Sequence, residues 1–166
     1  MKADDNEQYS RRCTIRITGL KENNGEATDY AEKEVQRILT AVGSSAAIQR
    51  CHRVGPKQKP PTGTKGSAPA AAKAPAPPYS RAVICQFTGQ RDKLNVMALK
   101  KEIHDKFKVR INEDLTKYRA SLAFQARNLK RNGKIKSTWT SDGKILVQDA
   151  SLKIHLVRTH KDLEKW

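Results

Sequence analysis

The sequence predicts an α+β protein of two folded units, with the element order β-α-β-β-α-β in the first and α-β-β-β-α in the second. Two observations predict this organisation. Segments of alternating β-branched residues take turns with segments whose apolar residues recur every three or four positions, as on one face of a helix. All seven prolines lie between Pro56 and Pro78, in a stretch without apolar periodicity that has strand-like sequence on both sides.

The first half of the first unit is expected to hold two strands and one helix. Residues 13–20 alternate as a strand does, and residues 48–54 predict a second, shorter strand. Residues 29–42 predict a helix with one apolar stripe, which Gly43 ends as a C-cap. The stripe consists of Ala31, Val35, Ile38, Leu39 and Val42.

The second half of this unit follows the proline segment. Residues 81–88 predict a strand, residues 91–107 a helix and residues 109–111 a weaker strand. Neither half could close a core alone, so together they predict one four-stranded ferredoxin-like sheet backed by two helices over residues 11–115. Residues 55–79 then form a disordered insert rich in Pro, Ala and Lys between the second and third strands, and residues 1–10 form a flexible N-terminal segment.

The second unit, residues 116–166, begins with a helix over residues 116–132. On one side of this helix lie Tyr118, Leu122, Ala126 and Leu129. A hairpin follows over residues 136–147, and its dipeptide Asp142-Gly143 suits a type I′ turn because both central residues need positive φ. Residues 153–158 predict a third strand, and Thr159 and Asp162 have capping-box spacing for a last helix.

Charge is concentrated in this second unit. The chain of 166 residues has 33 Lys or Arg and 17 Asp or Glu, a net charge of +16, and residues 116–166 carry twelve basic residues against four acidic ones. Between Thr116 and Ser141 there are seven Lys or Arg and no Asp or Glu. A helical face of one sign repels itself unless a polyanion lies across it, which favours a nucleic acid as the partner.

The predicted nucleic-acid contacts fall into two groups. The contacts on and after the basic helix are Arg119, Arg127, Lys130, Arg131, Lys134 and Lys136. In the first unit, Arg12, Arg16 and Arg53 are expected to form a basic sheet surface that holds phosphates. Two aromatic residues leave alternatives open. Phe124 could stack a base or pack against the first unit, and Trp139 could stack a base or pack in the core against Leu146, its expected cross-strand neighbour.

Other classes of function have little support in the sequence. No apolar run reaches the 18 residues that a membrane span needs, and no signal peptide opens the chain. Three cysteines far apart indicate a reducing compartment, and no C-x₂-C, Walker, G-x-S-x-G or H-E-x-x-H motif is present. We therefore expect no metal, no cofactor, no enzymatic activity and no membrane partner.

The first unit resembles an RNA-recognition motif. The stacking positions of that family fall here on Arg16, Ala82 and Ile84, none of which is aromatic. A wider resemblance covers residues 11–163 apart from the insert. It rests on the segments RRCTIRITGL, IQRCHRVG, RAVICQFT, INEDLTKYRASL, RNLKRNGKIKSTWTSDGKILVQD and KIHLVRTHKDL. In this order they resemble the first-open-reading-frame protein of LINE-type non-LTR retrotransposons, and the C-terminal unit is also similar to the C-terminal domain of the baculovirus few-polyhedra protein.

This resemblance implies a protein that coats the element's RNA in a cytoplasmic or nuclear ribonucleoprotein and acts as a nucleic-acid chaperone during transposition. The expected ligand is single-stranded RNA, with single-stranded DNA left open. In the family an N-terminal coiled coil usually makes a trimer. No heptads precede Arg11 here, so self-association through such a coiled coil would need a segment absent from this chain. One alternative is an assembly protein whose basic face docks an acidic protein. Another is a nuclease, although Asp142 and Asp149, the two carboxylates that flank the hairpin, are better explained by turn chemistry than by two-metal catalysis.

Overall fold

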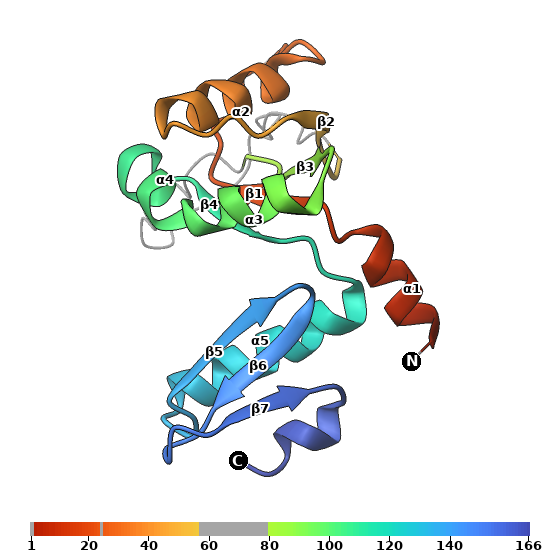
Figure 1. Ribbon diagram of the computed structural model, residues 1–166, viewed down its shortest axis with the longest axis vertical. Helices are drawn as coiled ribbons and strands as arrows, with labels where there is room; N and C mark the ends of the chain where they lie inside the picture. Colours follow the sequence, from red (N-terminus) through yellow and green to blue (C-terminus); the bar gives the residue numbers. More distant parts are fainter. Residues whose placement is uncertain (1, 24, 57–79) are drawn as a thin grey trace, which may run out of the picture.

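A computed structural model describes residues 2–23, 25–56 and 80–166 as a mixed α+β protein with two antiparallel sheets (Figure 1). The insert predicted at residues 55–79 lies outside the described residues from position 57 on. The first unit consists of β1 (Thr14–Thr18), α2 (Tyr30–Ala41), β2 (Ile48–Arg53), β3 (Val83–Phe87), α3 (Gln90–Ala98), α4 (Lys100–Phe107) and β4 (Arg110–Glu113). The helix expected over residues 91–107 is therefore two helices, which meet at Leu99.

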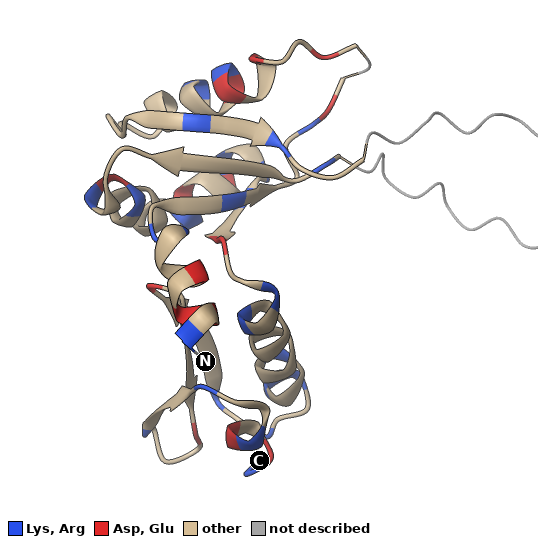
Figure 2. Ribbon diagram, turned by 90° about the vertical axis from the view of Figure 1, so that its right-hand side faces the viewer, with Lys and Arg blue, Asp and Glu red and all other residues tan. Residues whose placement is uncertain are grey.

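The four strands of the first sheet lie in the order β2-β3-β1-β4, and each neighbouring pair is antiparallel. Alternate strand residues, including Ile15, Ile17 and Phe87, are buried against helical residues such as Val35 and Ile103. All three helices thus cover one face of the sheet. The other face is turned toward the viewer in Figure 2. The side chains of this open face do not belong to the helix-covered core.

The second unit packs one helix against one face of a three-stranded sheet. Its elements are α5 (Lys117–Arg131), β5 (Ser137–Ser141), β6 (Lys144–Gln148), β7 (Ile154–Val157) and the 3-10 turn η1 (His160–Leu163). Leu122 and Ala126 of α5 contact a core that includes Ile145, Val147 and Val157. The last helix expected from the sequence is only one 3-10 turn, although the predicted capping box of Thr159 and Asp162 is formed. Asp142 and Gly143 both have positive φ, +50° and +73°, as the predicted turn requires.

The N-terminal segment differs from its prediction. Residues 2–10 form helix α1 (Lys2–Ser10), which lies at the junction of the two units (Figure 1). The Gln8 side chain is buried there, donating to the carbonyl of Asp114 and accepting from the amide of Thr116, both at 3.0 Å. The flexible segment predicted for residues 1–10 is thus replaced by a docked helix. Periodicity did not indicate it because its contacts are polar and it has no apolar stripe.

The hairpin tip of the second unit is hydrogen-bonded to the first unit. Gly143 is buried, and its amide donates to Glu113 at 3.0 Å. The same carboxylate accepts from Lys93 of α3 at 2.5 Å, and both side chains are almost inaccessible to solvent. Beside them the Gln90 amide donates to Asp142 at 3.0 Å. These contacts link the two units at the β5–β6 turn.

We predict that Gly143→Ala destabilises the protein more than the matched change Gly133→Ala. Both glycines have φ near +70°, so each substitution carries a backbone cost of about 1–2 kcal/mol. A Cβ at Gly143 would lie 2.6 Å from Cγ of the hydrogen-bonded Gln8, whereas a Cβ at Gly133 would meet nothing within 4 Å. We expect a further loss of about 1–3 kcal/mol for Gly143→Ala in denaturant unfolding. Equal losses for both variants would contradict a tightly packed junction.

Candidate nucleic-acid interface

The open face of the first sheet carries three arginines. Arg16 lies between Ile84 and Asn112, its cross-strand neighbours, with 43% of its side chain exposed. The register places Arg50 beside Gln86, which pairs with Thr14, and places Arg110 beside Thr18. Residues opposite one another or two apart on a strand share a face, so Arg16, Arg50 and Arg110 lie on the same surface.

Arg50 and Arg110 were not among the contacts predicted from the sequence, although their positions in expected strands pointed to the sheet. Arg50 and Arg110 are exposed and belong to strand segments that were expected there. Their common face with Arg16 follows from the cross-strand register, which the sequence alone does not supply. Arg16 itself is not entirely free, because Asp114 lies 3.4 Å from its guanidinium. His52 belongs to this face as well, and its buried Nδ1 has no hydrogen-bond partner among the described residues.

The structure corrects the prediction for Arg53. Only 4% of its side chain is exposed, and its guanidinium binds Glu26 through Nε and Nη2 at 2.6 and 2.9 Å. Its remaining N–H groups donate to the carbonyl oxygens of Leu20, Lys21 and Arg81. A guanidinium has five N–H donors, and all five are used here. Arg53 therefore ties chain segments together at one end of the sheet and is not available to a phosphate.

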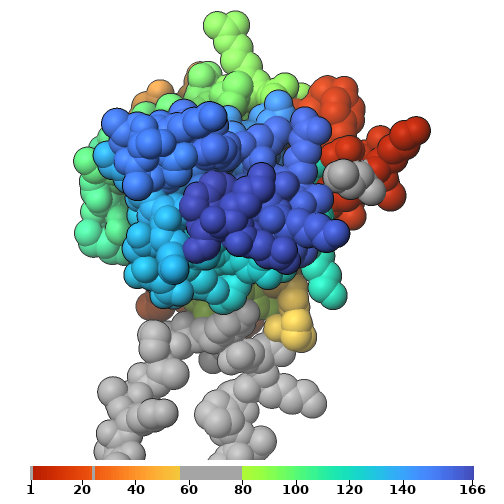
Figure 3. Space-filling view, turned by 90° about the horizontal axis from the view of Figure 1, so that it is seen from below, coloured from red at the N-terminus to blue at the C-terminus, as the bar shows by residue number. Residues whose placement is uncertain are grey.

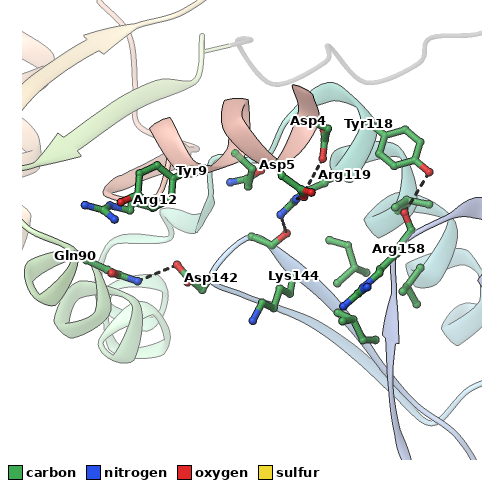
Figure 4. Close-up of a pocket in the computed structure, with 16 residues that line it drawn as sticks. Asp4, Asp5, Tyr9, Arg12, Gln90, Tyr118, Arg119, Asp142, Lys144 and Arg158 are labelled. Carbon is green, nitrogen blue, oxygen red and sulfur yellow. Dashed lines mark hydrogen bonds and ion pairs between the residues drawn. The ribbon is translucent and has the colours of Figure 1, made fainter. Parts of the chain in front are cut away.

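Arg119 is corrected in the same way. Its guanidinium binds Asp4 at 2.8 Å and Asp5, both from α1, and donates to the carbonyl of Gly143 at 3.0 Å (Figure 4). Its side chain is 17% exposed. The run from Thr116 to Ser141 lacks acidic residues in sequence, but α1 supplies two carboxylates in space. Arg119 belongs to the junction of the units rather than to an open basic face.

The carboxylates of the junction are held in their charged form. Burial pushes the pKa of Glu113 upward, but Lys93, the Gly143 amide and the Thr140 hydroxyl outweigh burial, so the pKa lies below 4.5. Burial also raises the pKa of Asp4, but the Thr116 hydroxyl and the Arg119 guanidinium lower it further, so this pKa lies below 3.8. Because both pKa values are depressed on folding, these groups stabilise the fold above the unfolded-state values. That contribution is lost as pH falls through the folded values.

The remaining cations of α5 do form an exposed face. Arg127, Lys130 and Arg131 are exposed, as are Lys134 and Lys136 after the helix ends. Phe124 is 55% exposed on the side of α5 opposite Leu122 and Ala126. We define the α5 face as Lys117, Phe124, Arg127, Lys130 and Arg131. No Asp or Glu forms an ion pair with its cations among residues 2–23, 25–56 and 80–166, and the other positions contain no Asp or Glu.

Arg12 and Trp139 lie on other surfaces. Arg12 is exposed, and its guanidinium lies 4.2 Å from the centre of the Tyr9 ring. Arg12 and Tyr9 line a cavity of about 520 Å³ between the end of α1 and the second sheet (Figure 4). Trp139 has Leu146 as its cross-strand neighbour, as predicted, but this pair lies on the sheet face away from α5. Trp139 is 36% exposed, so the alternative that it packs in the core does not hold.

The groups considered for catalysis have structural partners. Asp149 accepts from the Ser151 hydroxyl at 2.7 Å, meets the His155 ring at 2.7 Å and accepts from the Lys153 amide at 3.0 Å. The Ser151 and His155 contacts lower the pKa of Asp149 to about 2. Asp142 accepts from Gln90. The described part of the chain contains no cluster of three or more potential metal-binding side chains.

The three cysteines are unpaired, and Cys51 and Cys85 are buried opposite each other on β2 and β3. Contact with Cys51, together with burial, raises the pKa of the Cys85 thiol. Among the helices of the described residues, none has the length and apolar character needed to cross a membrane.

Comparison with known proteins does not assign the chain to a family. No family model matches it, and the search of curated proteins found no match either.

We predict that Arg119→Ala lowers the free energy of unfolding. The change removes the cation shared by Asp4 and Asp5, which should cost about 1–3 kcal/mol, between the values for exposed and buried ion pairs. Hydrogen exchange in residues 2–10 should accelerate. Arg127→Ala, two turns further along the same helix and exposed, is the matched control and should leave unfolding unchanged. Similar stability for the two variants would contradict the junction role of Arg119.

Proposed function

We propose that this protein binds single-stranded nucleic acid, RNA foremost, through basic surfaces and without catalysing a reaction. The observation that carries the proposal is the α5 face, where exposed cations surround Phe124 with no described carboxylate paired to them. In the rest of the protein, several cations do have acidic partners, such as Arg53 with Glu26 and Arg81 with Glu22. A surface that keeps unpaired like charges together is stabilised when a polyanion neutralises it.

The chemistry of the α5 face suits a single strand. Arg127 and Arg131 can each hold a phosphate through two N–H groups, which Lys cannot do with the same geometry. An exposed ring such as Phe124 can stack an unpaired base, an interaction worth about 1–3 kcal/mol. Phosphate contacts carry no direct sequence information, and stacking tolerates every base. Binding with little sequence preference therefore follows.

The first unit supports the same proposal. Its strand order β2-β3-β1-β4, with helices on one face, supports the proposal of a ferredoxin-like βαββαβ domain of the RNA-recognition type. Such domains bind RNA on the open face of the sheet, mainly by stacking on aromatic residues. Here that face offers Arg16, Arg50 and Arg110, so we propose that it holds phosphates instead.

The resemblance to the LINE first-open-reading-frame protein supplies the biological context of the proposal. In that setting the protein would coat element RNA in a cytoplasmic or nuclear ribonucleoprotein. It would act as a chaperone during transposition if many weak phosphate contacts form and break quickly. Single-stranded DNA offers the same phosphates and bases, so it remains a second ligand.

An assembly role is the second candidate, and one observation favours it. The first turns of α5 already dock an acidic helix, since Arg119 binds Asp4 and Asp5 of α1. The α5 face could dock an acidic helix of another protein in the same manner. A titration across salt with labelled single-stranded RNA, single-stranded DNA and duplex separates the two. We expect single strands to bind most tightly at every salt concentration. A protein that binds none of them at physiological salt would refute nucleic-acid binding.

We predict that Arg127→Ala with Arg131→Ala weakens binding to single-stranded RNA and flattens its salt dependence. Each lost phosphate contact should reduce the slope of log K against log salt by about 0.7. Thermal unfolding should not change, because both side chains are exposed.

The matched control removes the same charge elsewhere. Lys100 and Lys101 are exposed on α4, on the helical side of the first sheet, and form no ion pair among the described residues. Lys100→Ala with Lys101→Ala should leave the slope unchanged. If both double variants reduce the slope equally, net charge rather than the α5 face determines binding.

A further inference from the structure

The second sheet has an apolar face that the fold leaves open. Trp139 of β5, Leu146 of β6 and Leu156 of β7 are direct cross-strand neighbours and form one row. Ile154, two residues before Leu156, lies on the same side. Trp139, Leu156 and Ile154 are 36%, 39% and 55% exposed. The opposite face of the same sheet packs against α5, so this row is not part of the core.

Two cations, Lys144 and Arg158, border this row on the side that faces the hairpin tip. Lys144 pairs with Ser141 and lies two residues before Leu146, which places it on the same face. Arg158 follows β7 directly, two residues after Leu156. Both are exposed and form no ion pair in the described part of the chain, and together with Leu156 they line the cavity of about 520 Å³. Arg12 and Tyr9 lie on the opposite side of that cavity (Figure 4).

The carboxylates near this cavity have partners other than Lys144, Arg158 and Arg12. Asp4 and Asp5 bind Arg119, and Asp142 accepts from Gln90. Lys144, Arg158 and Arg12 form no ion pair with any of these carboxylates among the described residues, so their N–H groups are free to donate to a ligand. Apolar surface next to free cations suits a molecule that has flat apolar faces and an anionic backbone. Unpaired nucleotides have both properties, whereas the bases of a duplex are stacked on one another and hidden.

We propose that the open face of the second sheet is a nucleobase-stacking site for single-stranded RNA or DNA. An unpaired base lies on Trp139, the aliphatic side chains of Leu146 and Leu156 extend the platform, and Lys144 and Arg158 hold the adjoining phosphate. This inference rests on the proposed nucleic-acid binding and adds a further contact surface, separate from the α5 face and from the open face of the first sheet. It also accounts for a tryptophan at a solvent-exposed position of a sheet.

The experiment uses the fluorescence of Trp139. The chain has two tryptophans, and Trp166→Phe leaves Trp139 as the reporter in an otherwise unchanged chain. Oligouridine and a duplex RNA of equal length, each with a fluorescent label, are titrated, and anisotropy measures total binding in parallel. We expect oligouridine to quench Trp139 emission by more than half at saturation and duplex to leave it nearly unchanged.

Two variants test the energetic contribution. Trp139→Leu should weaken oligouridine binding about 5- to 160-fold, the range that corresponds to one stacked base, without changing the salt slope. Trp139→Phe should restore most of the affinity, because a phenyl ring can also stack. Leu152→Ala removes another exposed apolar side chain, outside β6 and β7, and should have no effect. Thermal unfolding of each variant verifies that the fold is intact.

The possible failures are distinguishable. Oligouridine that binds by anisotropy while Trp139 emission stays constant and Trp139→Leu binds normally would overturn the stacking site but leave the proposed function standing. No binding of any oligonucleotide would remove both. Sedimentation that shows a dimer dissociated by Trp139→Leu would mean that a second copy covers this face, and it would also overturn the proposal.

Discussion

The buried carboxylate of Glu113 is the constraint on which the arrangement of the two units depends. Its two oxygens accept from Lys93 of α3 and from the Gly143 amide at the hairpin tip, so one side chain of β4 links both units. An unpaired charge in this position would be strongly unfavourable, and removing one partner of a buried pair typically costs about 3–5 kcal/mol. The hairpin tip therefore has to stay where its amide satisfies Glu113. A glycine at the tip permits both the positive φ and the close approach of Gln8.

The cations of this strongly basic chain are of two kinds. Lys93, Arg119 and Arg53 are enclosed by carboxylates and carbonyl groups and hold the structure together. Arg127, Lys130 and Arg131 have no such partners among the described residues and give the surface its charge. Net charge counts both kinds equally, although only the second can meet a polyanion. Figure 3 shows the C-terminal unit from below, with α1 at its side. From this position α1 supplies acidic partners, Asp4 and Asp5, only to the first turn of α5.

Sequence reasoning succeeded where the determining chemistry is local. The type I′ turn at Asp142-Gly143, the capping box at Thr159 and the apolar stripes of α2 and α5 depend on residues within a few positions of one another. It failed for Arg53 and Arg119 because their carboxylate partners, Glu26 and Asp4, are distant in the chain. The register of Trp139 with Leu146 was predictable, but the face on which the pair lies depends on where α5 packs. Helix α1 went unnoticed because its anchoring residue is the amide Gln8 rather than an apolar side chain.

Two of the surfaces proposed for nucleic acid belong to the second unit and lie on its opposite sides, since α5 covers one face of the sheet and Trp139 lies on the other. A single strand that contacts both must pass around an edge of this unit. The connection from α5 to β5 lies along one such path, and it contains Lys134 and Lys136, both exposed. On α5 alone these two lysines would be peripheral, but on a wrapped path they supply phosphate contacts between the two stacking positions, Phe124 and Trp139. A duplex is too stiff to follow so short a turn, whereas a single strand bends freely. The geometry of the unit thus favours single strands for a reason independent of the exposed bases themselves.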